Sequence, residues 1–253
     1  MGGENGGRPW VEMRGIHKWF GGVHALKGVD FHVHRGEVVG LIGDNGAGKS
    51  TLIKILSGVF PPDKGEIVVE GRKVRFRSPK DAKEHGIETV YQELALVDNL
   101  DVPANIFLGR EPALVGGQSL MALLNKGRML REARALLERL KVNIGDLNAL
   151  AGELSGGQRQ TVAIARALYR EPKLLIMDEP TAALAVQETR KVLDLVRKLK
   201  ERDIGVVFIS HTLQEVFAVA DRIVILRKGE KVGDLPADEL TIDEAVKLMV
   251  GGE

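Results

Sequence analysis

The stretch of the chain with the most specific chemistry is GDNGAGKST, residues 43–51. It matches the pattern G-x-x-x-x-G-K-[ST], follows a predicted strand at 38–42 and precedes a helix-compatible run at 51–58, which is the setting that this motif requires. Its glycines let the backbone turn tightly and aim N–H groups at phosphates, and the start of a helix attracts anions. The predicted phosphate-binding residues are Gly43, Asp44, Asn45, Gly46, Ala47, Gly48, Lys49, Ser50 and Thr51.

Two side chains of this loop and two acids further along predict a reaction at the phosphates. Lys49 would hold the β- and γ-phosphates of a nucleotide, and the Ser50 hydroxyl would ligate Mg²⁺. The apolar run LLIMDEP, residues 174–180, ends in Asp178 and Glu179. Asp178 can ligate or orient the magnesium, and Glu179 can accept a proton from, or polarise, a water that attacks the γ-phosphate.

A second glycine-rich stretch, LSGGQRQ at residues 154–160, also has the composition of an anion site. A serine hydroxyl, exposed backbone N–H groups and the start of a helix all favour a negative charge. Taken alone, LSGGQ could also be an ordinary N-capped helix. Two phosphate cradles in one small chain raise the question of whether both act on one nucleotide.

The strands that must position these residues are predicted from hydrophobic patterning. Continuous apolar runs that alternate with helical stretches indicate a sheet buried on both faces. Two hairpins are also predicted: one joins residues 31–34 to 37–43, and the other spans 66–76 and turns at Gly71. The apolar runs lie at 174–178, 206–210 and 222–226.

Helical patterning dominates two further regions. Residues 187–203 predict an amphipathic helix. Between residues 93 and 165 helical stretches such as 127–140 predominate and no convincing strand occurs, so we interpret this region as a helical lobe inserted between the halves of an α/β core. Residues 241–253 predict a short closing helix. The apolar face of the first of these helices is formed by Val192, Leu195, Val196 and Leu199.

Composition narrows the class of protein. The chain has 253 residues, a formal net charge of +1 and no cysteine. The charge balance argues against a nucleic-acid partner, and the absence of cysteine excludes disulfides and Cys-based zinc sites and fits a reducing compartment. Residues 1–9 are expected to form a flexible tail rather than a signal peptide. No apolar run approaches the roughly 18–20 residues of a membrane span, so membrane association is expected through a partner.

The order of the motifs resembles that of the ATP-binding cassette (ABC) ATPases. A phosphate-binding loop followed by LSGGQ, LLIMDEP and ISH covers nearly the whole chain, about residues 10–250. The resemblance implies a nucleotide-dependent homodimer in which the two cradles hold opposite sides of one ATP. The signature residues Ser155, Gly156, Gly157 and Gln158 of one copy would reach the γ-phosphate held by the partner's Lys49.

The resemblance also implies a fold. We expect an α/β P-loop NTPase core with a mostly parallel sheet, an antiparallel β subdomain and an inserted helical subdomain. A single domain is expected over residues 10–253, with the helical subdomain at about 93–165. The cofactors implied are ATP and Mg²⁺.

Three more site residues follow from matching the family's motifs. Gln92, in VYQEL, resembles the glutamine that contacts magnesium and the attacking water while joining the core to the helical lobe. His211, in VFISHT, resembles the switch histidine that bonds the γ-phosphate. Phe20, in HKWFGG, matches the aromatic that stacks on adenine, with Trp19 as the alternative.

One position departs from the family. After DEPTAAL most members have an aspartate, and this chain has Ala185. In the family that acid helps to couple the two composite sites of the dimer. Hydrolysis is still expected because Lys49, Asp178 and Glu179 are present, but the coupling between sites is in question.

The sequence around the phosphate-binding loop, Gln92 and Ala185 resembles that of the sugar-import branch, which includes ribose, xylose and fructose transporters. This implies separate permease subunits, an indirect partnership with a substrate-binding protein, and a location at the cytoplasmic face of the cell membrane. Many members of that branch fuse two cassettes, so this chain belongs to a single-cassette system or is half of a longer protein. An exporter ATPase and a non-transport ABC ATPase of repair or translation remain the alternatives.

Overall fold

The computed structural model describes residues 7–112, 124–140, 142, 144–182 and 184–251, and contains two β-sheets. The six-stranded sheet has the order β10-β9-β3-β8-β7-β6, and the four-stranded sheet has the order β2-β1-β4-β5. The strands of the first are β3 (Val38–Ile42), β6 (Ile87–Val90), β7 (Leu174–Asp178), β8 (Gly205–Ile209), β9 (Arg222–Arg227) and β10 (Glu230–Pro236). Those of the second are β1 (Val11–Phe20), β2 (Val23–Val33), β4 (Lys64–Val69) and β5 (Arg72–Val74).

The six-stranded sheet brings three motifs to one edge. Strands β9, β3, β8, β7 and β6 are parallel, and only β10 runs antiparallel. The carboxyl ends of β3, β7 and β8 therefore lie together, with Asp178 paired to Ile209. The phosphate-binding loop follows β3, the acidic pair follows β7, and His211 follows β8. Ligands in open parallel sheets bind at this edge.

This sheet is buried on both faces, as the apolar runs predicted. Side chains alternate between two hydrophobic clusters because successive residues of a strand point to opposite faces. In β8, Val206 and Phe208 pack on the helical side, whereas Val207 and Ile209 pack against the four-stranded sheet and α1 (Lys49–Leu56). The sheet is thus the common wall of two cores.

One predicted hairpin is confirmed and the other is wrong. Strands β4 and β5 form the antiparallel hairpin that turns at Glu70 and Gly71. Residues 31–34 and 37–43 do not pair, since β2 belongs to the four-stranded sheet and β3 to the six-stranded one. The short turn between them crosses from one sheet to the other. Glu37 anchors this crossing by accepting from the His34 N–H at 2.7 Å and from Arg222 Nε at 2.7 Å.

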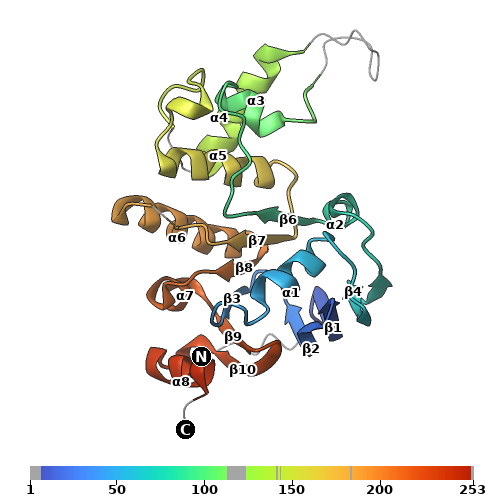
Figure 1. Cartoon of the computed structure of the whole chain (residues 1–253). Coiled ribbons are helices and arrows are strands. Elements are labelled where there is room, and N and C mark those ends of the chain that lie inside the picture. Colours follow the sequence, from blue (N-terminus) through green and yellow to red (C-terminus); the bar gives the residue numbers. More distant parts are fainter. Residues whose placement is uncertain (1–6, 113–123, 141, 143, 183, 252–253) are drawn as a thin grey trace.

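The helical lobe comprises α3 (Val102–Phe107), α4 (Lys126–Leu140) and α5 (Gly156–Leu168). Figure 1 shows these three helices together at one end of the molecule, beyond the β6 edge of the sheet. The chain enters the lobe from β6 and returns to the neighbouring strand β7. Helix α5 continues to residue 168, three residues beyond the predicted end of the lobe.

The remaining helices support the core. They are α2 (Pro79–Glu84), α6 (Val186–Lys200), α7 (Leu213–Val219), α8 (Ile242–Val250), and two 3₁₀ turns, Ala151–Glu153 and Ala237–Glu239. The predicted apolar face of α6 is confirmed, since all four of its residues are buried. The predicted fold class is also confirmed.

Two expectations concern the ends of the chain and the membrane. Most of the predicted N-terminal tail, residues 1–6, lies outside the described residues. Within the described ranges, no helix combines the length and the apolar character that crossing a bilayer demands.

Candidate nucleotide site

The phosphate-binding loop turns sharply from β3 into α1. Gly48 precedes the helix with φ of 108°, in the left-handed region that favours glycine. A Cβ at Gly48 would lie 2.8 Å from Leu26 Cδ2, so the packing excludes a side chain as well. In the described part of the chain no side chain caps α1. The first N–H groups of α1 are therefore available to an anion.

Lys49 is held inside this loop. Its side chain is largely buried, with 8% of the residue exposed, and Nζ donates to the carbonyl oxygens of Gly43 at 2.5 Å and Asp44 at 3.2 Å. Burial lowers the pKa of Lys49, opposed by the nearby carboxylates of Glu179, Asp44 and Asp178. An ammonium group has three donors, so Lys49 is placed to give its remaining N–H to a phosphate.

The two predicted acids lie opposite Lys49. Burial raises the pKa of Asp178, and the Lys49 charge lowers it in part. Burial likewise raises the pKa of Glu179, opposed chiefly by His211. His211 Nε2 lies 3.2 Å from Glu179 Oε1, and the His211 backbone N–H donates to Oε2 at 3.3 Å. Elevated carboxyl pKa values in a cleft are typical of general bases.

A buried polar network that the motifs did not reveal supports this pair. Glu215, on α7, accepts from Thr181 Oγ1 at 2.5 Å and from Ser210 Oγ at 3.0 Å. Ser210 Oγ also accepts from the Thr212 N–H at 3.1 Å. These bonds join the loop after Glu179 to the turn that carries His211. The sequence signals this network only by a hydroxyl residue at each motif, Thr181 after Glu179 and Ser210 before His211.

Lys49, both acids and His211 line one cavity of about 670 Å³. This volume lies within the range of ordinary small-molecule sites, about 300–1,000 Å³. The Ser50 hydroxyl, the Gln92 amide and the Asp178 carboxylate provide the oxygen ligands that Mg²⁺ prefers, with room for phosphate oxygens. The uncapped start of α1 and the Lys49 ammonium provide the donors for phosphate. The residues present therefore fit a magnesium–nucleotide complex.

Gln92 is exposed and reaches this cavity from the loop after β6. The residues that follow it are fixed to the helical lobe by one side chain of α5. Arg166 donates to the carbonyl oxygens of Leu94 at 2.6 Å and Ala95 at 2.8 Å. Gln92 thus stands between the cavity and the lobe.

The second cradle lies elsewhere. Ser155 is the N-cap of α5 and accepts from the Gln158 N–H at 3.3 Å, while the Ser155 N–H donates to Gln158 Oε1 at 2.8 Å. Ser155 and Gly156 are exposed to solvent. As far as the structure describes the lining of the 670 Å³ cavity, it includes none of residues 155–158. A single chain therefore brings together the loop, the acids, Gln92 and His211, but not the signature.

Comparison with known proteins identifies the family of the chain that carries this site. The family model described as ABC transporter matches residues 26–182, more than half of the chain. The chain belongs to the ABC transporter ATP-binding family. It is an ATPase, and its cofactors are ATP and Mg²⁺.

Relatives of known assignment fall in one branch of the cassette family. The cassette is 49% identical over 239 residues to a xylose/arabinose import ATP-binding protein of Sulfolobus acidocaldarius, covering 94% of this chain and 93% of that protein. It is 51% identical over 244 residues to a ribose import ATP-binding protein of Rubrobacter xylanophilus. That match covers 96% of this chain but 47% of the ribose protein, so the chain spans about half of that relative.

Solved structures agree in fold. The ADP conformation of an ABC transporter cassette has a TM-score of 0.81 and 29% identity, covering 97% of this chain and 96% of that one. A dimeric bacterial cassette has a TM-score of 0.75 and 26% identity, covering 90% of this chain and 98% of that one.

Phe20 is not among the described residues that line the cavity of the cassette. The residue is 46% exposed, and its ring makes an edge contact with Phe60, the centroids being 5.3 Å apart. Trp19 is stacked on His24 at 4.1 Å, with 11° between the ring planes. Because Trp19 already has a stacking partner, Phe20 is the better placed of the two to receive adenine.

Sequence reasoning also missed part of the lining. The start of β2 contributes His24 and Lys27, and the turn between β9 and β10 contributes Lys228. The positive charges of Lys27 and Lys228 increase the attraction of this site for anions. No motif marks these residues, because they reach the cavity only where β2 and the β9–β10 turn meet the phosphate-binding loop in the folded chain.

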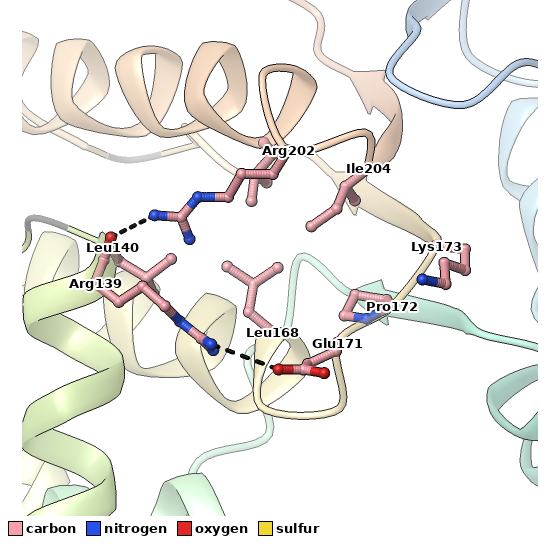
Figure 2. Close-up of a pocket in the computed structure, with 9 residues that line it drawn as sticks. Arg139, Leu140, Leu168, Glu171, Pro172, Lys173, Arg202 and Ile204 are labelled. Carbon is pink, nitrogen blue, oxygen red and sulfur yellow. Dashed lines mark hydrogen bonds and ion pairs between the residues drawn. The ribbon is translucent and has the colours of Figure 1, made fainter.

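A separate cavity of about 420 Å³ lies where the helical lobe meets the core (Figure 2). Arg202 Nη2 donates to the carbonyl oxygen of Arg139 at 2.6 Å, and Arg139 Nη1 lies 3.5 Å from Glu171 Oε1. These contacts hold the end of α4 to the end of α6 and to the segment before β7. None of the predicted site residues lines this cavity, so we assign it to packing between lobe and core.

Proposed function

We propose that this cassette is the ATPase subunit of an importer of simple sugars, acting as a nucleotide-dependent homodimer on separate permease subunits. The observation that carries the proposal is the convergence of Lys49, Asp178, Glu179 and His211 on one cavity. The sugar class is supported by relatives that import xylose, arabinose and ribose. In this proposal the cassette binds the cytoplasmic face of the membrane through the permease.

The geometry supports a division of labour at the γ-phosphate. The start of α1 and Lys49 bind and orient the phosphates, and Glu179 accepts a proton from the attacking water. His211, held beside Glu179, bonds the γ-phosphate. When bound, Mg²⁺ neutralises charge that develops on the phosphate oxygens, and Ser50, Gln92 and Asp178 would hold it.

The signature residues complete the site in the dimer. Their separation from the cavity within one chain supports a role across an interface, with Ser155, Gly156, Gly157 and Gln158 facing the partner's ATP. The solved dimeric cassette shows that this fold can form dimers. A substrate-binding protein would deliver the sugar to the permease without touching the cassette.

Gln92 would transmit the state of the nucleotide to the permease. Its side chain senses the γ-phosphate and magnesium, and Arg166 ties the segment behind it to the helical lobe. Loss of the γ-phosphate would release Gln92 and allow the lobe to rotate. A ligand contact that biases a hinged element is a common form of switching.

Sugar uptake measured beside ATP hydrolysis tests this function. The cassette is reconstituted in vesicles with its permease subunits and binding protein, and radiolabelled xylose, arabinose, ribose and fructose are compared. ATP-dependent uptake of at least one of them supports the proposal. Extrusion of substrate, or ATP hydrolysis that no sugar stimulates, would favour the exporter or non-transport alternatives.

Gln92→Ala sharpens the same assay. We expect it to reduce uptake more than basal ATP hydrolysis, because Glu179 still positions the water whereas the link to the lobe is lost. Gln187→Ala, which removes an exposed glutamine of α6, is the control and should leave both activities unchanged. Equal losses of uptake and hydrolysis in Gln92→Ala would make Gln92 chiefly catalytic.

A further inference from the structure

One carboxylate connects the N-terminus of α6 with that of α5. Glu188 is the third residue of α6, whose N-cap, Ala185, makes no side-chain cap. A glutamate at this position commonly bonds back to the N-cap of its own helix. Here Ser155 Oγ of the signature donates to Glu188 Oε1 at 3.1 Å.

The carboxylate lies close against the first turn of α5. A Cβ placed on Gly157 would be 2.4 Å from Glu188 Cδ and 2.5 Å from Oε1. Only glycine therefore leaves room for the carboxylate at this place. The partial positive charge of a helix N-terminus favours an anion there, and this anion belongs to the chain itself.

We propose that Glu188 is an intramolecular occupant of the signature, which the γ-phosphate of the partner's ATP must displace when the dimer closes. The inference rests on the proposed function, because it takes Ser155 and Gly157 as contacts of that phosphate. Two anions at contact distance repel each other strongly. Glu188 thus opposes closure and sets the ATP concentration at which the dimer forms.

The displaced carboxylate has another partner within reach. Lys191 lies one turn further along α6, on the same side of the helix. Glu188, Lys191 and Gly157 line a common cavity of about 360 Å³ between α5 and α6. Glu188 can therefore exchange Ser155 for Lys191 by a change of side-chain conformation. This exchange would couple the signature to α6, which begins shortly after Glu179.

Dimerisation in the Glu179→Gln background tests the proposal. Glu188→Gln keeps the size of the side chain and an oxygen acceptor for Ser155, and removes only the charge. We expect roughly tenfold tighter ATP-dependent dimerisation, within the usual range of coupling between sites, measured by light scattering across ATP concentrations. Glu201→Gln, which neutralises an exposed carboxylate at the other end of α6, should change the affinity less than about twofold.

Salt dependence separates this electrostatic role from a structural one. The gain in Glu188→Gln should be smaller at 1 M salt, where the Debye length is about 3 Å, than at 0.1 M, where it is about 10 Å. The melting temperature of the variant should stay close to that of the Glu201→Gln control. A gain that is independent of salt, or one that follows a change in melting temperature, would mean that Glu188 acts through the fold.

Lys191→Gln provides an independent arm. It should weaken dimerisation when Glu188 is present, because the displaced carboxylate loses its partner, and have no effect in the Glu188→Gln variant. If neither change alters a dimer that forms normally, the proposal is wrong and the composite site stands. If ATP produces no dimer in the parent Glu179→Gln protein, the composite site itself fails.

Discussion

The N-termini of α1 and α5 are both glycine-rich and both suit an anion, yet they are built in opposite ways. Gly48 leaves α1 without a side-chain cap, and the loop, Lys49 and the neighbouring strands line a cavity before it. At α5, Ser155 caps the helix and the Glu188 carboxylate lies against it on an exposed surface.

The difference shows what each helix start is prepared for. The start of α1 has uncapped donors at a cavity that the same chain lines, so it suits the phosphates of a nucleotide bound by one chain. At the start of α5 the Gln158 N–H is capped by Ser155, and the Ser155 hydroxyl is bonded to Glu188. In our proposal a phosphate therefore arrives with a second surface and displaces Glu188. In the proposed dimer this difference accounts for two cradles that act on one nucleotide.

The largest effect is expected at the cavity before α1. Glu179→Gln should lower steady-state ATP turnover by about 10²–10⁴-fold, the usual contribution of a general base. ATP binding should persist because α1 and Lys49 are unchanged. Turnover and binding of a fluorescent ATP analogue are measured together, with Glu201→Gln as the control. Wild-type turnover in Glu179→Gln would remove Glu179 from the mechanism.

The next largest effect is expected at the start of α5, where Ser155 is exposed. Ser155→Arg in the Glu179→Gln background should weaken ATP-dependent dimerisation at least about tenfold, because an overpacked interface costs about 1–3 kcal/mol. Ala135→Arg adds the same side chain to an exposed position of α4 and should leave the dimer intact. Light scattering gives the mass in both cases. A normal dimer in Ser155→Arg would place the interface elsewhere.

The pH dependence of turnover tests the enclosure of the acids. Burial raises the pKa of Glu179, and only the ionised carboxylate can act as a base. The acid limb of the pH profile of kcat/KM, which reports the free enzyme, should therefore lie above the ordinary glutamate value of about 4.3. The same raised pKa means that the nucleotide-free protein gains stability as pH falls through it. An acid limb at the ordinary value would contradict the effect of burial.

The smallest effect concerns α6, whose N-cap is Ala185. Ala185→Asp restores the acid found in most family members and should increase the free energy of unfolding by about 1 kcal/mol, because it accepts from a free N–H of the helix. Ala185→Asn provides the same cap without charge and serves as the control. Urea unfolding gives both values, and no gain from either would show that this N–H is already bonded.

Sequence patterns predicted much of this molecule because the relevant signals are local. The apolar runs at 174–178 and 206–210, which alternate with helical stretches, indicate strands buried on both faces, and the loop at 43–51 has few uses other than phosphate binding. The resemblance to the family, based on the order of the motifs, then assigned the two acids, Gln92 and His211 to the predicted site. The strand β1 escaped prediction because Gly15 and register shifts interrupt its alternation.

The tertiary structure decided what depends on contacts between distant segments. Residues 31–43 looked like a hairpin, but pairing partners elsewhere place β2 and β3 in different sheets. No motif marks the support of Glu215 for Thr181 and Ser210, the lining by His24, or the contact of Glu188 with Ser155, since each joins residues from separate elements. The sequence by itself determined which groups can do the chemistry. Only packing determined that the first cradle is open to a ligand and the second is occupied, because a helix end is satisfied or free according to what the fold places beside it.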